Sequence, residues 1–370
     1  MGTGFLKTLV ECNYDIICWT IRRDIMKILT FFNNKGGVGK TTLTVNLASY
    51  LAKSFEKKIL VLDADPQANT TQMIIPQENW IDFYGEGETK DTAKNLFAPI
   101  RRGDPLIDSN ISLFKGTDHH FYFDVIPGDP SLSIIEDRLS EAWSSAKSGD
   151  PGGIRTTNWI NKLFSEFNDR YDYLIVDVGP SLGALNRSIL LNSDYIVTPM
   201  GSDIFSLMGI KNIASWIKEW RKIYMNGIKL FRDSPDYASI ICEELINIDV
   251  EKKTLLGGYS IQQYNARKFK TGKRAVTAYD TIISQMPSTI EKELDFLIPS
   301  TLKNMKALNL GDVPYLNSII PLAQSNNVPL FDLGAREGVR GQQYSNVKEF
   351  EIMIEKIAKN LLSNVGDSHA

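Results

Sequence analysis

Residues 31–45 read FFNNKGGVGKTTLTV, and this stretch passes from an apolar run through three glycines into residues with helical spacing. The apolar run begins upstream as KILTFFN at 27–33, which is typical of a parallel strand covered on both faces. After the glycines, Leu43, Leu47 and Leu51 recur every four residues, as the apolar stripe of a helix does. The order strand, glycine turn, helix predicts an α/β fold.

The glycine turn has the composition of a phosphate-binding loop. Glycines allow backbone N–H groups to turn toward phosphate oxygens, and the N-terminus of the following helix adds positive potential. In such a loop Lys40 would reach the β and γ phosphates, and the Thr41 hydroxyl would bind Mg²⁺. Asn34 stands where the pattern GxxxxGK[ST] requires its first glycine, and Lys35 is an additional lysine on the outer lip. The predicted nucleotide-binding residues are Lys35, Gly36, Gly37, Val38, Gly39, Lys40, Thr41 and Thr42.

Further apolar runs alternate with helical patterns along the chain. Strands are predicted at 27–33, 58–65, 122–129, 171–180, 194–200, 254–261 and 315–320. Helices are predicted at 131–147, 156–168, 204–222 and 346–362. This alternation indicates a doubly wound, mostly parallel sheet.

The chain is predicted to be one domain, residues 26–370, with insertions near 76–120, 225–250 and 285–312, where patterning is weak and connections are long. Met26 immediately precedes the first strand. Residues 1–25 are therefore expected to be an N-terminal extension, to which no role is assigned.

Composition excludes several classes of protein. The chain has 370 residues, 43% of them hydrophobic, and a net charge of −3. It has no apolar run of eighteen residues, so no membrane association through a spanning helix is expected. Cys12, Cys18 and Cys242 are scattered without a CxxC pair, which argues against a disulfide framework, a zinc ribbon or an iron–sulfur cluster. We expect a cytoplasmic protein.

Three aspartates stand at the predicted ends of two strands. Asp63 and Asp65 close the run at 58–65, and Asp177 follows the apolar residues YLIV at 173–176. The carboxyl ends of parallel strands meet at one edge of the sheet, so these acids can reach the metal and water beside the phosphates. Asp177 stands where acids hold Mg²⁺ through water. Aspartates at strand ends also serve as caps or turn formers, and from the residues alone that alternative stays open.

Together these motifs resemble the ParA/MinD family of P-loop ATPases. KGGVGKTT at 35–42 is similar to the deviant Walker A motif, DADPQ at 63–67 to the DxDPQ motif, and DVGPSLG at 177–183 to the DxPPSLG motif of that family. The resemblance extends from about residue 27 to residue 362, and it is closest to ParA-like (Soj-like) partition ATPases without a helix-turn-helix domain.

The resemblance implies a role for each site residue. Lys35 looks like the signature lysine, which reaches the partner's ATP across a nucleotide sandwich dimer. Asp65 would position the attacking water, and the predicted catalytic residues are Lys35, Lys40 and Asp65. Thr41, Asp63 and Asp177 would hold Mg²⁺ or its shell. Gly179 replaces the first proline of the family motif, which puts the switching of that loop in question.

A basic segment lies in the second half of the chain. Between residues 251 and 274 stand seven Lys or Arg and one acid, a net charge of +6, which suggests contact with a polyanion. Within it, YNAR at 264–267 is similar to a family YDxR pattern, with Asn265 in place of aspartate. By that resemblance the DNA-binding residues would be Arg267, Lys268, Lys270, Lys273 and Arg274. On charge alone, a solvated loop is the alternative.

The function implied is slow, partner-stimulated, Mg²⁺-dependent hydrolysis of ATP by a homodimer that binds nonspecific DNA. Such a dimer would position DNA or another cargo with a ParB-like partner. Two alternatives share the fold: an ATP-dependent ligase, and a MinD-like membrane switch. The acids Glu349, Glu351 and Glu355 in the terminal helix would repel anionic lipid, which disfavours the membrane switch.

Overall fold

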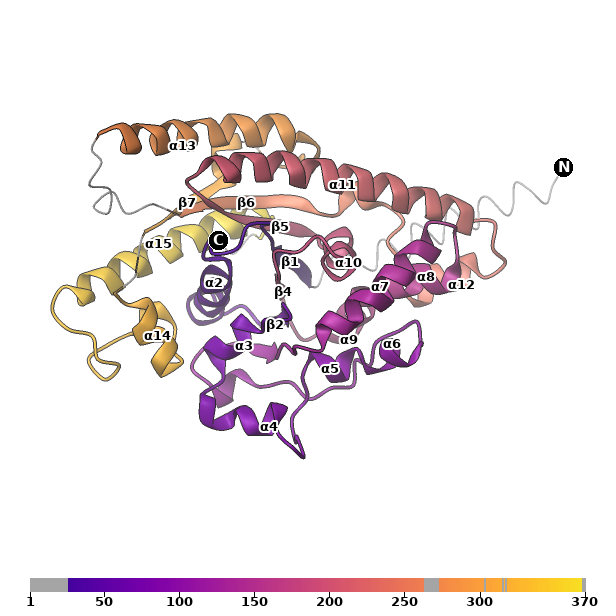
Figure 1. Cartoon of the computed structure of the whole chain (residues 1–370), viewed down its shortest axis with the longest axis horizontal. Helices are drawn as coiled ribbons and strands as arrows, with labels where there is room; N and C mark the ends of the chain where they lie inside the picture. Colours follow the sequence, from indigo (N-terminus) through magenta and orange to yellow (C-terminus); the bar gives the residue numbers. More distant parts are fainter. Residues whose placement is uncertain (1–25, 263–272, 303, 315, 317, 368–370) are drawn as a thin grey trace.

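The computed structural model describes residues 26–262, 273–302, 304–314, 316 and 318–367. Its centre is one seven-stranded sheet with the strand order β3-β2-β4-β1-β5-β6-β7 (Figure 1). All six neighbouring strand pairs are parallel, so the predicted doubly wound α/β fold is confirmed. The strands are β1 (Lys27–Phe31), β2 (Ile59–Ala64), β3 (Asp124–Ile126), β4 (Tyr173–Val178), β5 (Tyr195–Gly201), β6 (Leu255–Gln262) and β7 (Asn309–Val313).

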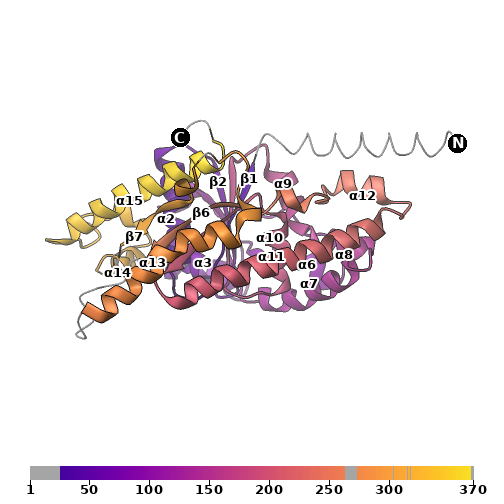
Figure 2. The ribbon, with the colours of Figure 1, turned by 90° about the horizontal axis from the view of Figure 1, so that it is seen from above.

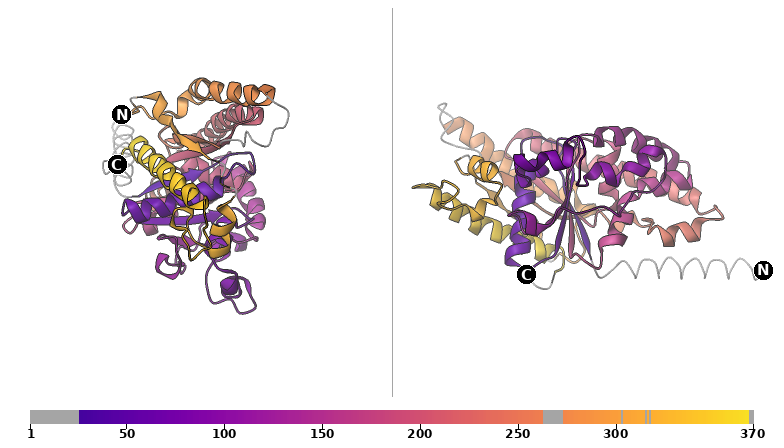
Figure 3. Two further views of the ribbon diagram at one scale, coloured as in Figure 1. Left: turned by 90° about the vertical axis from the view of Figure 1, so that its left-hand side faces the viewer. Right: turned by 90° about the horizontal axis from the view of Figure 1, so that it is seen from below.

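Side chains alternate along the central strands into two separate apolar cores. In β2, for example, Leu60 and Leu62 lie in one core and Val61 in the other. The helices on the first side are α5 (Ala93–Leu96), α6 (Ala98–Arg102), α7 (Leu132–Ala146), α8 (Pro151–Thr157), α9 (Trp159–Phe167), α10 (Ala184–Asn192), α11 (Ile204–Phe231), α12 (Tyr237–Glu243) and α13 (Lys273–Glu293). Those on the second side are α2 (Lys40–Ser54), α3 (Asn69–Ile74), α4 (Trp80–Tyr84), α14 (Ile320–Asn326) and α15 (Gln343–Asn364). Figures 2 and 3 show helices on both sides of the sheet.

The strand predicted at 315–320 is wrong. Leu316 and Ile319 are three residues apart and both are buried in the second core, which is the spacing of a helical turn. The backbone N–H groups of Ile319 and Ile320 both donate to the carbonyl of Leu316, at 3.0 and 3.2 Å, and α14 begins there. Pro321 in the first turn favours this start. The seventh strand is instead β7, which lies mostly in the interval predicted as the third insertion.

The remaining helix predictions differ mainly in extent. The helix predicted at 156–168 consists of α8 and α9, separated at the buried Asn158. The helix predicted at 204–222 continues to Phe231 as α11, which takes up part of the interval 225–250. The interval 76–120 contains the short helices α4, α5 and α6. Residues 1–25 lie outside the described part of the chain.

Two expectations drawn from composition, on disulfides and on membrane-spanning helices, can be compared with the structure. Cys242 of α12 is disulfide-bonded, a single bond that the argument against a disulfide framework did not anticipate. Among the helices of the described residues, none combines the length and the apolar character needed to cross a membrane.

Candidate functional site

The glycine loop connects β1 to α2 with two residues in the left-handed region. Gly37 has φ 75° and Gly39 has φ 72°, values that favour glycine. A Cβ added at Gly36 or Gly37 would meet no atom within 4 Å, so the space above the loop is open. No side chain caps the first turn of α2, which begins at Lys40. The N-terminus of α2 therefore offers its positive potential to a ligand of the loop.

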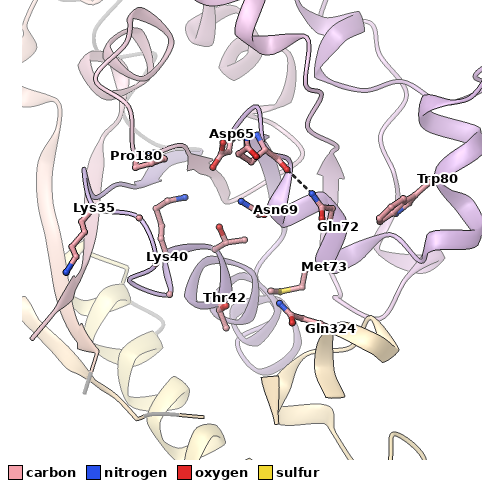
Figure 4. A pocket seen from close by; sticks show the side chains of 15 residues that line it. Lys35, Lys40, Thr42, Asp65, Asn69, Gln72, Met73, Trp80, Pro180 and Gln324 are labelled. Atoms are coloured by element: carbon pink, nitrogen blue, oxygen red, sulfur yellow. Dashed lines mark hydrogen bonds between the residues drawn. The ribbon is translucent and has the colours of Figure 1, made fainter. Parts of the chain in front are cut away.

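This loop forms the floor of a 620 Å³ pocket at the carboxyl edge of the sheet (Figure 4). Asp65 after β2 and Pro180 after β4 line it beside the loop, and Trp80 of α4 and Gln324 of α14 line it as well. Figure 4 shows that the Lys40 side chain points into the pocket, toward Asn69 and Asp65. The pocket thus brings together the lysine and the acid predicted for phosphate and water.

Asp177 of β4 is fully buried, and three residues near the loop hold its carboxylate. Lys40 Nζ forms an ion pair with Oδ1. The Thr41 and Thr70 hydroxyls each donate a hydrogen bond to Oδ2 at 2.8 Å. The structure thus joins the adjacent Lys40 and Thr41 to Asp177, which lies 136 positions beyond Thr41, and it adds Thr70.

Asp63 lies beside Asp177 in the register of β2 and β4, and it is also fully buried. Burial, and next the charge of Asp177, raises the pKa of Asp63 to about 7. Its Oδ2 accepts hydrogen bonds from the N–H and the hydroxyl of Thr71, at 2.9 and 2.7 Å. The Thr71 hydroxyl in turn accepts the N–H of Gly128 at 2.7 Å. Asp63 thus fixes the start of α3 from behind the pocket, while Asp177 lies next to the loop.

Asp65 lies on the pocket wall with only 5% of its surface exposed. Its Oδ1 accepts the backbone N–H of Gln67 at 3.0 Å, which orients the carboxylate. Gly179 closes the space on the other side, because a Cβ at Gly179 would lie 3.2 Å from the same oxygen. Asp65 is therefore positioned by its own turn and by close approach of the loop after β4.

Lys35 differs from Lys40 in direction and in partner. Its side chain points away from the centre of the pocket (Figure 4), and Nζ forms an ion pair with Asp203. Asp203 is the N-cap residue of α11 and accepts the backbone N–H groups of Phe205 and Ser206, at 3.0 and 3.3 Å. Phe205, two residues after Asp203, is 66% exposed. The second lysine thus lies on the rim of the pocket, next to an exposed apolar surface.

The donors of this pocket fit a magnesium–nucleotide complex. A carboxylate flanked by hydroxyls presents hard oxygen atoms, which Mg²⁺ prefers, and the open glycine cradle suits phosphate oxygens. Thr41 and Asp177 would hold the ion, and Lys40 with the loop amides would hold the phosphates. In this structure the Lys40 ammonium neutralises the charge of the Asp177 carboxylate.

The predicted DNA-binding residues cannot be placed in the same way. Arg267, Lys268 and Lys270 lie outside the described residues. Lys273 and Arg274 are the first two residues of α13, and their side chains are not described.

Several residues that line the site were not predicted from the sequence. Thr70 lies three residues after the DADPQ motif, so its proximity to Asp177 could have been suspected. Asp203 carried the signal of an N-cap residue before a helix, but nothing in the sequence paired it with Lys35, 168 positions away. No signal marked Trp80 or Gln324.

Comparison with known proteins gives consistent matches. A family model described as "AAA domain" (AAA_31) matches residues 26–230. The chain is 30% identical over 192 residues to the sporulation initiation inhibitor protein Soj of Bacillus subtilis, a match that covers 52% of this chain and 65% of Soj. It is 31% identical over 192 residues to the chromosome partitioning protein ParA of Myxococcus xanthus, covering 52% of this chain and 58% of ParA. Both matches thus span less than two thirds of the relative's length.

Among solved structures, the fold is similar to the crystal structure of protein DIP2308 from Corynebacterium diphtheriae. The TM-score is 0.70 and the sequence identity 28%, with coverage of 92% of this chain and 99% of that chain. The similarity to this structure includes the part of the chain beyond residue 230.

Proposed function

The chain belongs to the AAA domain family AAA_31 and is a homologue of the ParA and Soj ATPases, and from this premise we propose that it is an ATP-dependent dimer switch. In this proposal the ATP-bound homodimer binds DNA of any sequence and positions DNA or another cargo. A ParB-like partner protein accelerates its slow hydrolysis of ATP. The name of the Myxococcus xanthus relative, a chromosome partitioning protein, supports this choice of cargo.

The observation that carries the proposal is the different placement of the two lysines. Lys40 points into the pocket, where one lysine suffices for the phosphates, while Lys35 points outward on the rim and pairs with Asp203. A lysine so placed could exchange its partly exposed partner Asp203 for a nucleotide held by a second copy of the chain. The exposed Phe205, two residues after Asp203, offers apolar surface for the same contact.

In this proposal, different residues of one pocket have different roles in ATP hydrolysis. Lys40 and the loop amides bind the phosphates, and Asp65 orients the attacking water. Thr41 and Asp177 would hold Mg²⁺, which would supply positive charge against the phosphates. Asp63 would support this shell from behind through Thr71 and the start of α3.

The test is to measure mass and DNA binding in parallel. Light scattering should give a monomer without nucleotide and a dimer with ATP and Mg²⁺, and only the dimer should bind two duplexes of unrelated sequence with similar affinity. Lys35→Ala should still bind ATP but should lose dimerisation or hydrolysis. A parent protein that stays monomeric in saturating ATP, or that binds no duplex at low salt, would exclude the proposed switch. Turnover dependent on a small carboxylate would indicate the ligase alternative.

A further inference from the structure

The long helix α11 carries a straight row of four lysines on its exposed side. Lys211, Lys218, Lys222 and Lys229 follow one another at steps of seven, four and seven residues. At about 100° per residue these steps return to the same side of a helix, so the four side chains lie within about 40° of arc. All four residues are exposed. We call them the α11 lysine row.

The lysine row has little local negative charge to neutralise it. Glu219 is the one acid of α11, and it lies about 80° around the helix from the row. Within the described residues, no carboxylate forms an ion pair with any lysine of the row. The Lys218 ammonium lies 4.5 Å from the centre of the Phe296 ring, a contact that leaves its charge available. The row is therefore a strip of four lysines that form no ion pair in the described part of the chain.

The opposite side of α11 is fixed in the protein core. Ile210, Ile213, Ile217 and Ile228 are buried in the first core, as are the large rings of Trp220, Tyr224 and Phe231. A helix that binds a membrane surface inserts its apolar face among the lipids, and this face of α11 is already occupied. The row can thus attract a polyanion by charge, but α11 cannot act as a membrane-inserting helix.

We propose that the lysine row of α11 binds the phosphate backbone of duplex DNA. At 1.5 Å per residue the row spans about 27 Å, with gaps of about 10, 6 and 10 Å. Lysine contacts to phosphates position a protein on DNA without reading its sequence. This inference rests on the DNA binding of the proposed function and adds a surface that does not involve residues 263–274. Figure 1 shows α11 beside α13. The first two residues of α13, Lys273 and Arg274, are also the last two of the basic segment 251–274.

The experiment compares two double variants that each remove two positive charges, one on each side of the sheet. Lys218→Gln/Lys222→Gln removes the centre of the row, and Lys348→Gln/Lys356→Gln removes two exposed lysines of α15 as the matched control. Lys218→Arg/Lys222→Arg keeps the charge. Fluorescence anisotropy would measure the affinity of each protein, with ATP and Mg²⁺, for two unrelated duplexes over a range of KCl concentrations.

The expected effect follows from counterion release. Each phosphate contact contributes about −0.9 to the slope of log affinity against log salt, so two lost contacts flatten the slope by about 1.8 per protomer engaged. At 0.1 M salt that corresponds to roughly 60-fold weaker binding per protomer. The α15 control and the arginine variant should bind both duplexes like the parent, and all variants should melt like the parent.

Three results would overturn the inference. If the parent binds DNA and the Lys218→Gln/Lys222→Gln variant keeps its affinity and slope, the row is only a solvated face, while the proposed function stands. If that variant instead loses binding to phosphatidylcholine vesicles containing phosphatidylglycerol but keeps its DNA affinity, the row serves a lipid surface. A parent that binds no duplex at all overturns both proposals.

Discussion

Replacing Lys40 should lower the free energy of unfolding of the protein and should also abolish nucleotide binding. The Asp177 side chain has no exposed surface and that of Lys40 only 10%, so Lys40→Ala leaves a buried carboxylate without its cation. Breaking a buried ion pair in this way costs about 3–5 kcal/mol. Thr41 and Thr70 still donate to the carboxylate, so we expect a loss near the lower end, about 3 kcal/mol in the free energy of unfolding.

Urea denaturation without nucleotide would measure this loss, and calorimetry with ATP and Mg²⁺ would measure binding. Lys40→Ala/Asp177→Asn removes the buried charge together with its partner, so it should recover most of the lost stability but none of the binding. Lys94→Ala is the control, because its pair with Glu88 is about one third exposed and should contribute less than about 1 kcal/mol. A double variant no more stable than Lys40→Ala would refute the electrostatic reasoning, and parent-like ATP affinity in Lys40→Ala would refute the site.

Three further outcomes are expected. Asp65→Ala should bind ATP, lose hydrolysis and accumulate as a dimer in light scattering; a monomer in excess ATP would contradict the sandwich. Asp203→Asn frees Lys35 from a pair that is about one third exposed, so the dimer should tighten only a few-fold by analytical ultracentrifugation, and weaker dimerisation would show that the pair supports the interface instead. Burial among aromatic rings lowers the pKa of His119 to about 4, whereas the unfolded chain takes up the proton near pH 6.5. Stability should therefore fall by about 3 kcal/mol as the pH drops from 6.5 to 4, and His119→Phe should remove this part of the pH dependence in urea titrations.

The phosphate loop and the sheet could be predicted because their signals are local. Strand β1, the glycines and α2 are contiguous, and the apolar runs of β2, β4 and β5 reflect burial on both faces of the sheet. Strand β7 lacks such a signal. Its sequence NLGDV contains a glycine at φ 151° and an aspartate, residue types that are depleted in strands, and only the neighbouring β6 and α15 make it part of the sheet.

The contact between Lys35 and Asp203 could not be predicted from the sequence. Lys35 and Asp203 each have an obvious local role, as a loop residue and as an N-cap, and these roles give no reason to pair them. The helix predicted at 204–222 already contains Lys211, Lys218 and Lys222, and the extension of α11 to Phe231 adds Lys229 to the same side. The full length of α11 therefore makes the row one lysine longer.

The glycine at position 179 illustrates how the structure changes the interpretation of a motif. A glycine in place of proline suggests a looser loop after β4, since it restricts the backbone less. The Asn186 side-chain amide, however, donates to the carbonyls of Gly179 and Ser181, both at 2.8 Å, and so ties the loop to α10. The remaining effect of glycine is steric, because Asp65 Oδ1 lies 3.2 Å from where a Cβ would stand. Gly179 therefore bears on the position of the Asp65 carboxylate, the group assigned to orient water, more than on the freedom of the loop.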